Sequence, residues 1–149
     1  FRSKEQVLAF LLTSMLGDIA TSVEAAAATC EDTRTRLSNV VRAQLGAMAA
    51  RPATSQLLVA NLGRAGKLPD IAAGMDRAFQ APVRKILSEG VESGEIRPVD
   101  PDPTATAIFG AVTVVGLHSL MLHGNLDVEK SLDALVVLWG GLAPTGEVT

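Results

Sequence analysis

Apolar residues recur at helical spacing through most of the chain, and they are densest between Pro103 and Leu142. The stretch 104–123 has no formally charged side chain and is apolar almost all the way round, so a helix there must be covered on most faces. Residues 127–142 instead form an amphipathic pattern, whose apolar stripe is Val128, Leu132, Leu135, Val136 and Trp139. The short link 124–126 predicts that the two helices are antiparallel neighbours. Because this hairpin has more apolar surface than a small domain easily hides, we expect the stripe to form a dimer interface.

Two helices are predicted in the first third of the chain. The first begins at a capping box, S-K-E-Q from Ser3, and runs to about Ala28. The second is capped by Asp32 or Thr33 and closed before Pro52, because the residue before a proline avoids the helical region. Their expected inner faces are Leu8, Leu11, Leu12, Met15, Ile19, Val23 and Ala26 in the first helix, and Leu37, Val40, Val41, Leu45 and Met48 in the second.

Two further helices are predicted in the middle of the chain. A short one is expected over about 54–62 and ends at two chain-breaking glycines. Pro69 suits the first turn of the next helix, and Gly94 suits the position just after its end. Pro82 lies within the apolar period of this helix and should kink it, since proline removes one backbone hydrogen bond and clashes with the preceding turn.

The fold class predicted from these patterns is all-α, with about six helices in one domain. No stretch keeps the alternation of a β-strand long enough to predict one. The apolar content, 48% of 149 residues, is carried by Ala, Leu and Val with few aromatics, which suits closely packed helices better than sheets. A chain of this length can bury a sizeable core.

Charge and cysteine content exclude several classes of function. The net charge of −3 gives the chain as a whole no electrostatic footprint for nucleic acid. Cys30 is the only cysteine, so an internal disulfide and a cysteine metal cluster are excluded, and a reducing cytoplasm is compatible with this composition. Glu89, Glu92 and Glu95 form an acidic row at helical spacing, which is most simply a solvated face.

Residues 104–123 are also long enough, at about 20 residues, to span a membrane. Against a span, the stretch holds three Thr, one Ser, two His and two Gly, and no aromatic belt flanks it. The opening of the chain has a hydrophobic run, but Glu5 precedes it and no cleavage-type continuation follows, so no signal peptide is expected. We therefore expect a cytoplasmic protein without membrane contact.

Three local patterns resemble the TetR (tetracycline-repressor) family of bacterial transcription regulators. FRSKEQVL at the start resembles the junction between that family's helix-turn-helix and the first helix of its regulatory domain. EGVESGEIRPVDPDPTATA resembles the connector into the penultimate helix, and HGNLDVEKSLDALVVLWGGL resembles the last turn and final helix. The resemblance covers essentially the whole chain as a C-terminal regulatory domain.

The resemblance implies a dimeric repressor whose affinity for operator DNA is tuned by a small hydrophobic effector. Residues 1–6 would then be the end of the DNA-binding domain and its junction, 7–142 the ligand-binding and dimerisation domain, and 143–149 a tail. The DNA-reading helices would precede Phe1, so this chain by itself would only dimerise and bind the effector. A different reading is a helical-bundle enzyme or carrier that acts on a lipid-like small molecule, and the sequence upstream of Phe1 would distinguish the two.

The resemblance also implies two kinds of site. Arg2 and Lys4 would lie near a DNA phosphate at the start of a helix, although ordinary surface bases are an equal reading. The family brings residues from four helices around one cavity, and the corresponding candidates here are Met48, Leu57, Leu58, Asn61, Met75, Phe79 and Phe109. Each of these alone is more often a plain core residue, but as a set they favour an apolar pocket.

Thr113 and His118 are further candidates for contact with the effector. Thr113 lies near Gly110 on one face of the 104–123 helix, and His118 could donate to a ligand or across a dimer interface. The sequence leaves open which face of that helix lines a pocket and which meets a second copy. His118 and His123 are five residues apart, so they lack the spacing of a metal pair, and we expect no metal and no cofactor.

No catalytic constellation is visible in the sequence. There is no Ser-His-acid arrangement with supporting turn geometry, no Glu-x-x-His motif and no glycine-rich phosphate loop after a strand. We therefore do not expect an enzyme.

Overall fold

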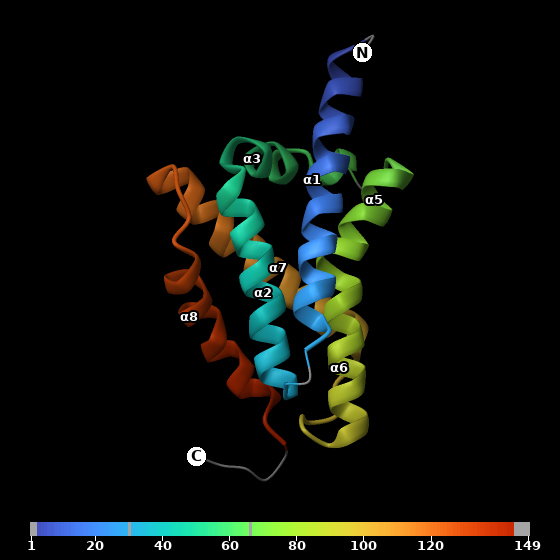
Figure 1. Cartoon of the computed structure of the whole chain (residues 1–149), viewed down its shortest axis with the longest axis vertical. Coiled ribbons are helices and arrows are strands. Elements are labelled where there is room, and N and C mark those ends of the chain that lie inside the picture. The colour runs from blue at the N-terminus through green and yellow to red at the C-terminus, as the bar shows by residue number, and fades with distance from the viewer. Residues whose placement is uncertain (1–2, 30, 66, 145–149) are drawn as a thin grey trace.

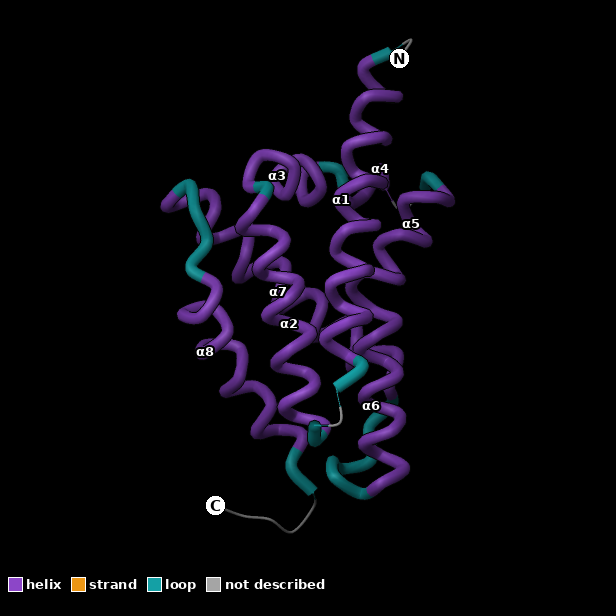
Figure 2. The backbone as a smooth tube through the Cα atoms, in the orientation of Figure 1, coloured by secondary structure: helices purple, strands orange, loops and turns teal. Residues whose placement is uncertain are grey.

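Helices make up nearly all of the chain in the computed structural model, which describes residues 3–29, 31–65 and 67–144 (Figures 1 and 2). Within these ranges no residue lies in a strand, and the prediction of an all-α fold is confirmed. The helices run mostly along the long axis of the molecule, and the first turns of the first helix project beyond the rest of the bundle (Figure 1).

The first two helices, α1 (Lys4–Ala27) and α2 (Thr33–Ala50), pack side by side at the centre of the bundle (Figure 1). Both have the predicted kind of cap. The Ser3 hydroxyl accepts from the Gln6 amide at 3.2 Å, and the Asp32 carboxylate accepts from the Thr35 amide at 2.9 Å. The whole predicted inner face of α2 is buried, whereas in α1 burial begins only at Leu12.

The connection across one end of the bundle consists of α3 (Pro52–Ala60) and α4 (Leu62–Ala65). The third helix therefore begins two residues earlier than the predicted start at 54. A proline in the first helical position loses nothing, because the N–H it lacks would have no partner inside the helix. A single turn, α4, follows it and was not predicted.

Near Pro82, where the sequence predicts a kink, the structure has a change of helix type. The segment divides into α5 (Pro69–Met75), a π-helical turn η1 (Asp76–Gln80) and α6 (Ala81–Ser93), which ends at Gly94 with φ +77°. Pro82 lies in the first turn of α6, where its missing N–H is tolerated. The one-residue widening of η1 allows the helix to continue past the proline.

The last helices are α7 (Pro101–His123) and α8 (Val128–Trp139), followed by one 3-10 turn, η2 (Gly140–Leu142). They are joined through Gly124, whose φ of +68° explains why glycine stands there. The start of α7 lies three residues before the expected 104, because its two prolines occupy first-turn positions and the Asp100 carboxylate caps it.

Most of the α8 stripe that the sequence predicts as a dimer interface is buried within its own chain, and the placement of the interface on this stripe is corrected. Leu132, Leu135 and Trp139 are 2%, 1% and 3% exposed because they pack on α2, and the Trp139 indole N–H donates to the Ser38 hydroxyl at 3.2 Å. Val128 is half-buried and only Val136, 41% exposed, is open to solvent. The stripe therefore holds α8 to its own subunit.

The acidic row 89–95 is not a uniformly solvated face. Glu89 forms an ion pair of 2.6 Å with Arg36 of α2. One carboxylate oxygen of Glu95 accepts from both the backbone N–H and the hydroxyl of Thr33, each at 2.7 Å. The backbone hydrogen bond from Thr33 is the largest of the interactions that hold the pKa of Glu95 below its ordinary value. Two of the three carboxylates thus tie the end of α6 to the start of α2.

Two described helices, α1 and α7, are long and apolar enough to cross a membrane by length and composition. In the bundle, 33% of the apolar window of α1 and 28% of that of α7 are buried. Core helices of helical bundles have the same length and composition, so this property by itself does not favour a membrane protein.

Candidate functional site

Five of the predicted effector-binding residues line one internal cavity, which we name the core cavity. They are Met48 of α2, Leu58 of α3, Phe79 of η1, and Phe109 and Thr113 of α7. Met15, Ser55, Val59 and Leu62 complete its wall. Residues that lie far apart in the sequence are thus brought to one place by the packing of α1, α3, η1 and α7 around the end of α2.

The core cavity is apolar and nearly closed, with a volume of about 10 Å³. That volume holds no more than one water molecule. One wall residue, Met48, packs closely on α7, because its methyl lies only 2.6 Å from where a Cβ on Gly116 would be. Glycine at 116 therefore makes room for Met48, and the flexible thioether closes this side of the cavity. An effector of any size would require the walls to shift.

Phe79 and Phe109 form the aromatic wall of the core cavity. Their ring centroids are 5.1 Å apart and the rings are tilted by 55°, a favourable arrangement for an aromatic pair. Phe79 is 3% exposed and is carried by the π-helical turn η1. Such turns occur often at functional sites, since they re-aim side chains within a helix. The position of Phe79 therefore depends on what holds η1 in this geometry.

Side-chain hydrogen bonds hold η1 both inside the bundle and at its surface. Inside, the side-chain amide of Gln44, 1% exposed, donates to the carbonyl oxygens of Ala78 and Phe79 at 3.0 and 3.3 Å. Outside, Arg84 donates two hydrogen bonds to Asp76, at 2.7 and 2.9 Å. These hydrogen bonds from Arg84 lower the pKa of Asp76, against the opposing effect of burial.

The structure does not bring the other four effector candidates to the core cavity. Leu57 is 41% exposed on the outer side of α3, and His118 is exposed on α7. Met75 packs half-buried against the core but does not line the cavity. Asn61 lies just beyond α3, where its amide donates to the Leu57 carbonyl at 2.8 Å. All four have plausible sequence spacing, but spacing does not determine which side of a helix faces which neighbour.

Sequence reasoning missed four residues of the cavity wall. Met15 was predicted only as a core residue of α1, and Val59 and Leu62 lie beside predicted positions. Ser55 is buried, and its hydroxyl is satisfied by the carbonyl oxygens of Met48 and Arg51, to which it donates at 3.1 and 2.8 Å. It thereby fixes the turn between α2 and α3 rather than offering a free polar group. The available sequence signal for this role was a serine three residues after the proline that begins a helix.

The predicted DNA-phosphate residues are only partly described. Lys4 is exposed at the first position of α1, and Arg2 lies outside the described residues. Among the residues that the structure describes, no group of three or more His, Cys, Asp or Glu side chains could hold a metal ion. His118 and His123 are both exposed.

Exposed apolar side chains gather on the last two long helices. On α7, Val114, Met121 and Leu122 are 64%, 70% and 63% exposed. On α8, Val137 and Leu138 are 76% and 54% exposed. We name these five residues the outer apolar surface. Large side chains of this kind, grouped on two helices, are typical of a surface that meets another protein.

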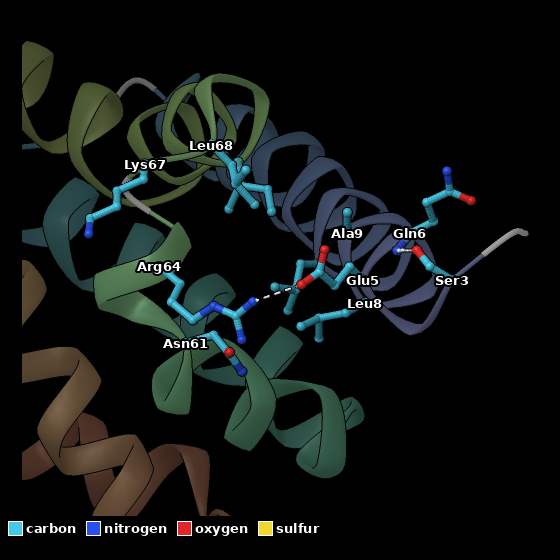
Figure 3. Close-up of a pocket in the computed structure, with 11 residues that line it drawn as sticks. Ser3, Glu5, Gln6, Leu8, Ala9, Asn61, Arg64, Lys67 and Leu68 are labelled. Carbon is cyan, nitrogen blue, oxygen red and sulfur yellow. Dashed lines mark hydrogen bonds and ion pairs between the residues drawn. The ribbon is translucent and has the colours of Figure 1, made fainter.

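A second, larger hollow lies beside the N-terminal turns of α1, and we name it the α1–α5 groove. It has a volume of about 590 Å³ and runs between the first turns of α1, α4 and the start of α5. Figure 3 shows Leu8, Ala9 and Leu68 along it, with Arg64 reaching across to Glu5. It shares no lining residue with the core cavity.

The fold and the core cavity define an all-α domain built around one small apolar site. Residues 30–116 match the family described as "Tetracyclin repressor-like, C-terminal domain", and the chain belongs to this family. The resemblance seen in the sequence is thereby confirmed, and a domain of this kind implies a TetR-family regulator.

One solved structure with the same fold is that of a protein with unknown function from Rhodococcus sp. RHA1. It superimposes with a TM-score of 0.79 over 96% of this chain and 76% of that chain. The sequences are 20% identical, so the likeness shows the fold alone. The comparison with curated proteins found no match.

Proposed function

We propose that this chain is the effector-binding and dimerising domain of a cytoplasmic, ligand-responsive transcriptional repressor. The observation that carries the proposal is the convergence of Met48, Leu58, Phe79, Phe109 and Thr113 on one apolar cavity, in a chain that belongs to the tetracyclin repressor-like family. Apolar sites between helices of a bundle, with one or two polar groups, are common places for small molecules. The effector that fits is small and hydrophobic.

The proposed site must enlarge before it can hold an effector, since about 10 Å³ is too small for any organic molecule. Two of its walls are suited to move. The Met48 side chain is flexible, and Phe79 is carried by a turn that can exchange one π-type hydrogen-bond pattern for an α-type one. Effector binding would then select the enlarged state, and the response would be a population shift between two arrangements.

The proposed dimer uses the outer apolar surface in place of the predicted stripe of α8. A second copy of the chain is the partner that fits, because a two-fold interface presents the same patch from both subunits. Val114, Met121 and Val137 would be covered, and the buried area should exceed about 1,000 Å² in total, the usual minimum for a specific interface. A change in the packing of α7 against η1 would reach this surface directly.

Operator recognition is assigned to a segment that precedes Phe1. Sequence-specific binding requires an element placed in a DNA groove, and phosphate contacts alone only position the protein. Lys4 and Arg2 would add at most a few such contacts in a chain of net charge −3. In the dimer, the two DNA-binding segments would have to match half-sites about 34–36 Å apart, and the effector-bound arrangement would not.

The DNA-binding part is tested by gel-shift titration of two proteins, the 149-residue chain and the chain extended upstream. The operator fragment is one selected from random DNA with the longer chain. At physiological salt the longer chain should shift this fragment in preference to a scrambled one, and the 149 residues alone should not. If the longer chain selects no sequence, the regulator proposal is overturned.

The effector site is tested by native mass spectrometry of protein purified from cells, with a matched pair of variants. Wild-type protein should appear as a dimer with a retained small hydrophobic molecule. Phe109→Leu should lower the retained fraction, because this side chain lines the core cavity and is only half-buried. Phe10→Leu, at an exposed position outside the cavity, should not. Equal retention by both variants would contradict the site, and chemical conversion of the retained molecule would favour the enzyme or carrier reading instead.

A further inference from the structure

The α1–α5 groove has the size and lining of a small-molecule site. Its volume of about 590 Å³ lies within the range of about 300–1,000 Å³ that is common for such sites. Leu8, Ala9 and Leu12 of α1 form one side, and Leu68 and Ile71 form the other. Leu68 is 49% exposed although it is a large apolar residue, so covering it would be favourable by the hydrophobic effect. The core cavity, by contrast, is nearly closed.

Charged groups lie at one edge of this apolar groove. The Arg64 guanidinium and the Glu5 carboxylate form an ion pair of 3.3 Å, and Lys67 also lines the groove. Within the described part of the chain, Lys67 has no ion pair. Asp70, in the first turn of α5, does not line the groove. Two cations against one carboxylate give the charged residues that line the groove a formal charge of +1, in a chain whose net charge is −3.

The ion pair at this edge can be exchanged for a ligand. The side chains of Arg64 and Glu5 are 69% and 82% exposed, and an exposed pair of this kind contributes little to stability. An arginine guanidinium binds a carboxylate through two parallel hydrogen bonds. A carboxylate that also has an apolar tail would therefore displace Glu5 from Arg64 and at the same time cover Leu8 and Leu68. A neutral amphiphile would gain only the second of these contacts.

We propose that the α1–α5 groove is a second binding site, separate from the core cavity, for a monoanionic amphiphile such as a medium-chain carboxylate. Arg64 binds the carboxylate, and the apolar wall between Leu8 and Leu68 receives the tail. The α1–α5 groove shares no lining residue with the core cavity, so its test is separate from the test of the proposed effector site. Its occupant bridges α1 to α4 and α5 across the groove.

The test compares decanoate with decanol, two probes of equal chain length that differ in charge, by isothermal titration calorimetry. Decanoate should bind with one molecule per chain and at least tenfold more tightly than decanol. Arg64→Gln should weaken decanoate at least fivefold and leave decanol unchanged. Glu5→Gln should tighten decanoate, because it removes the competing carboxylate. The matched control is Arg97→Gln, an exposed arginine outside the groove, which should change neither affinity.

Two further variants show where the probe binds. Ala9→Trp should fill the groove and abolish binding of both probes, and Leu68→Gln, at a half-exposed position that tolerates a polar side chain, should weaken both. Equal affinity for decanoate and decanol, no effect of Arg64→Gln, or unchanged binding in the Ala9→Trp and Leu68→Gln variants would each overturn the proposal. It is also overturned if the chain extended upstream of Phe1 loses decanoate binding, since the groove is then occupied by that segment.

Discussion

The side-chain amide of Gln44 donates a hydrogen bond of 3.0 Å to the carbonyl oxygen of Ala78, deep in the bundle. In a regular α-helix the donor to this carbonyl would be the N–H of residue 82, and Pro82 has none. A polar side chain from α2 thus satisfies a carbonyl that a proline in a neighbouring helix leaves without its usual partner. The same amide also donates to the carbonyl oxygen of Phe79. The side chain of Phe79 lines the core cavity.

Replacing Gln44 by Leu should destabilise the protein by about 1–3 kcal/mol, because two buried carbonyl groups each lose a hydrogen bond from its amide. The measurement is the free energy of unfolding from urea titration. Gln56→Leu is the matched control, since the Gln56 side chain is exposed and makes one long hydrogen bond of 3.4 Å. Its effect should stay within about 0.5 kcal/mol. Equal losses in the two variants would contradict the role of Gln44.

A double-mutant cycle with Pro82→Ala tests the cause of this arrangement. Alanine restores an N–H at residue 82, so the helix can satisfy the Ala78 carbonyl without help. Gln44→Leu should therefore cost less in the Pro82→Ala background than in the wild type, with a coupling of about 0.5–3 kcal/mol. Strict additivity of the two substitutions would show that the amide and the proline are not linked.

Gly90→Ala should destabilise the protein although alanine is the better helix former. A Cβ at residue 90 would lie 2.7 Å from the Thr33 hydroxyl and 2.8 Å from its methyl group, and Thr33 is held in place by Glu95. Overpacking of this kind costs about 1–3 kcal/mol. Gly46→Ala in α2 meets no atom within 4 Å and should instead stabilise by about 0.5–1 kcal/mol. Thermal unfolding of the two variants should give opposite shifts, and a shift of the same sign would contradict the packing.

The carboxylate of Glu95 should make stability fall in acid. Hydrogen bonds from Thr33 lower its pKa in the folded protein below the ordinary value of 4.5. The stabilisation is therefore complete above that value and is lost as the pH falls through the lower, folded pKa. Glu95→Gln should lower the Tm at pH 7, and the difference from wild type should shrink as the pH falls below the ordinary value of 4.5 and through the lower, folded pKa. The matched control is Glu92→Gln, an exposed carboxylate without a hydrogen bond in the described chain. A difference that is constant with pH would exclude the carboxylate as its source.

Neighbouring residues of α8 separate dimerisation from folding. Val137 is 76% exposed and belongs to the outer apolar surface, whereas Leu135 is 1% exposed in the core. Val137→Glu should give a folded monomer in analytical ultracentrifugation, with a helical circular dichroism spectrum like that of wild type. Leu135→Glu should lose cooperative folding, because it buries an unpaired charge. A Val137→Glu protein that still sediments as a dimer would show that subunits meet elsewhere.

The helices and their inner faces were largely predictable from the sequence alone. Ser3 and Asp127 are short polar residues that precede apolar runs, and both cap their helices. Gly94 and Gly124 end helices with positive φ. These features depend on residues within one or two turns of each other, so local physical chemistry is enough to predict them. The set of residues in the core cavity was partly predictable for the same reason, since Met48 and Phe79 lie on apolar faces.

Only the tertiary structure decided which neighbour each face meets. The stripe of Leu132, Leu135 and Trp139 indicated burial but not whether the partner was α2 or a second subunit. The roles of Gln44 and Glu95 depend on helices that are more than thirty residues away in the sequence. Periodicity specifies the direction of an apolar or polar face relative to its own helix axis, and packing between helices then determines what lies opposite.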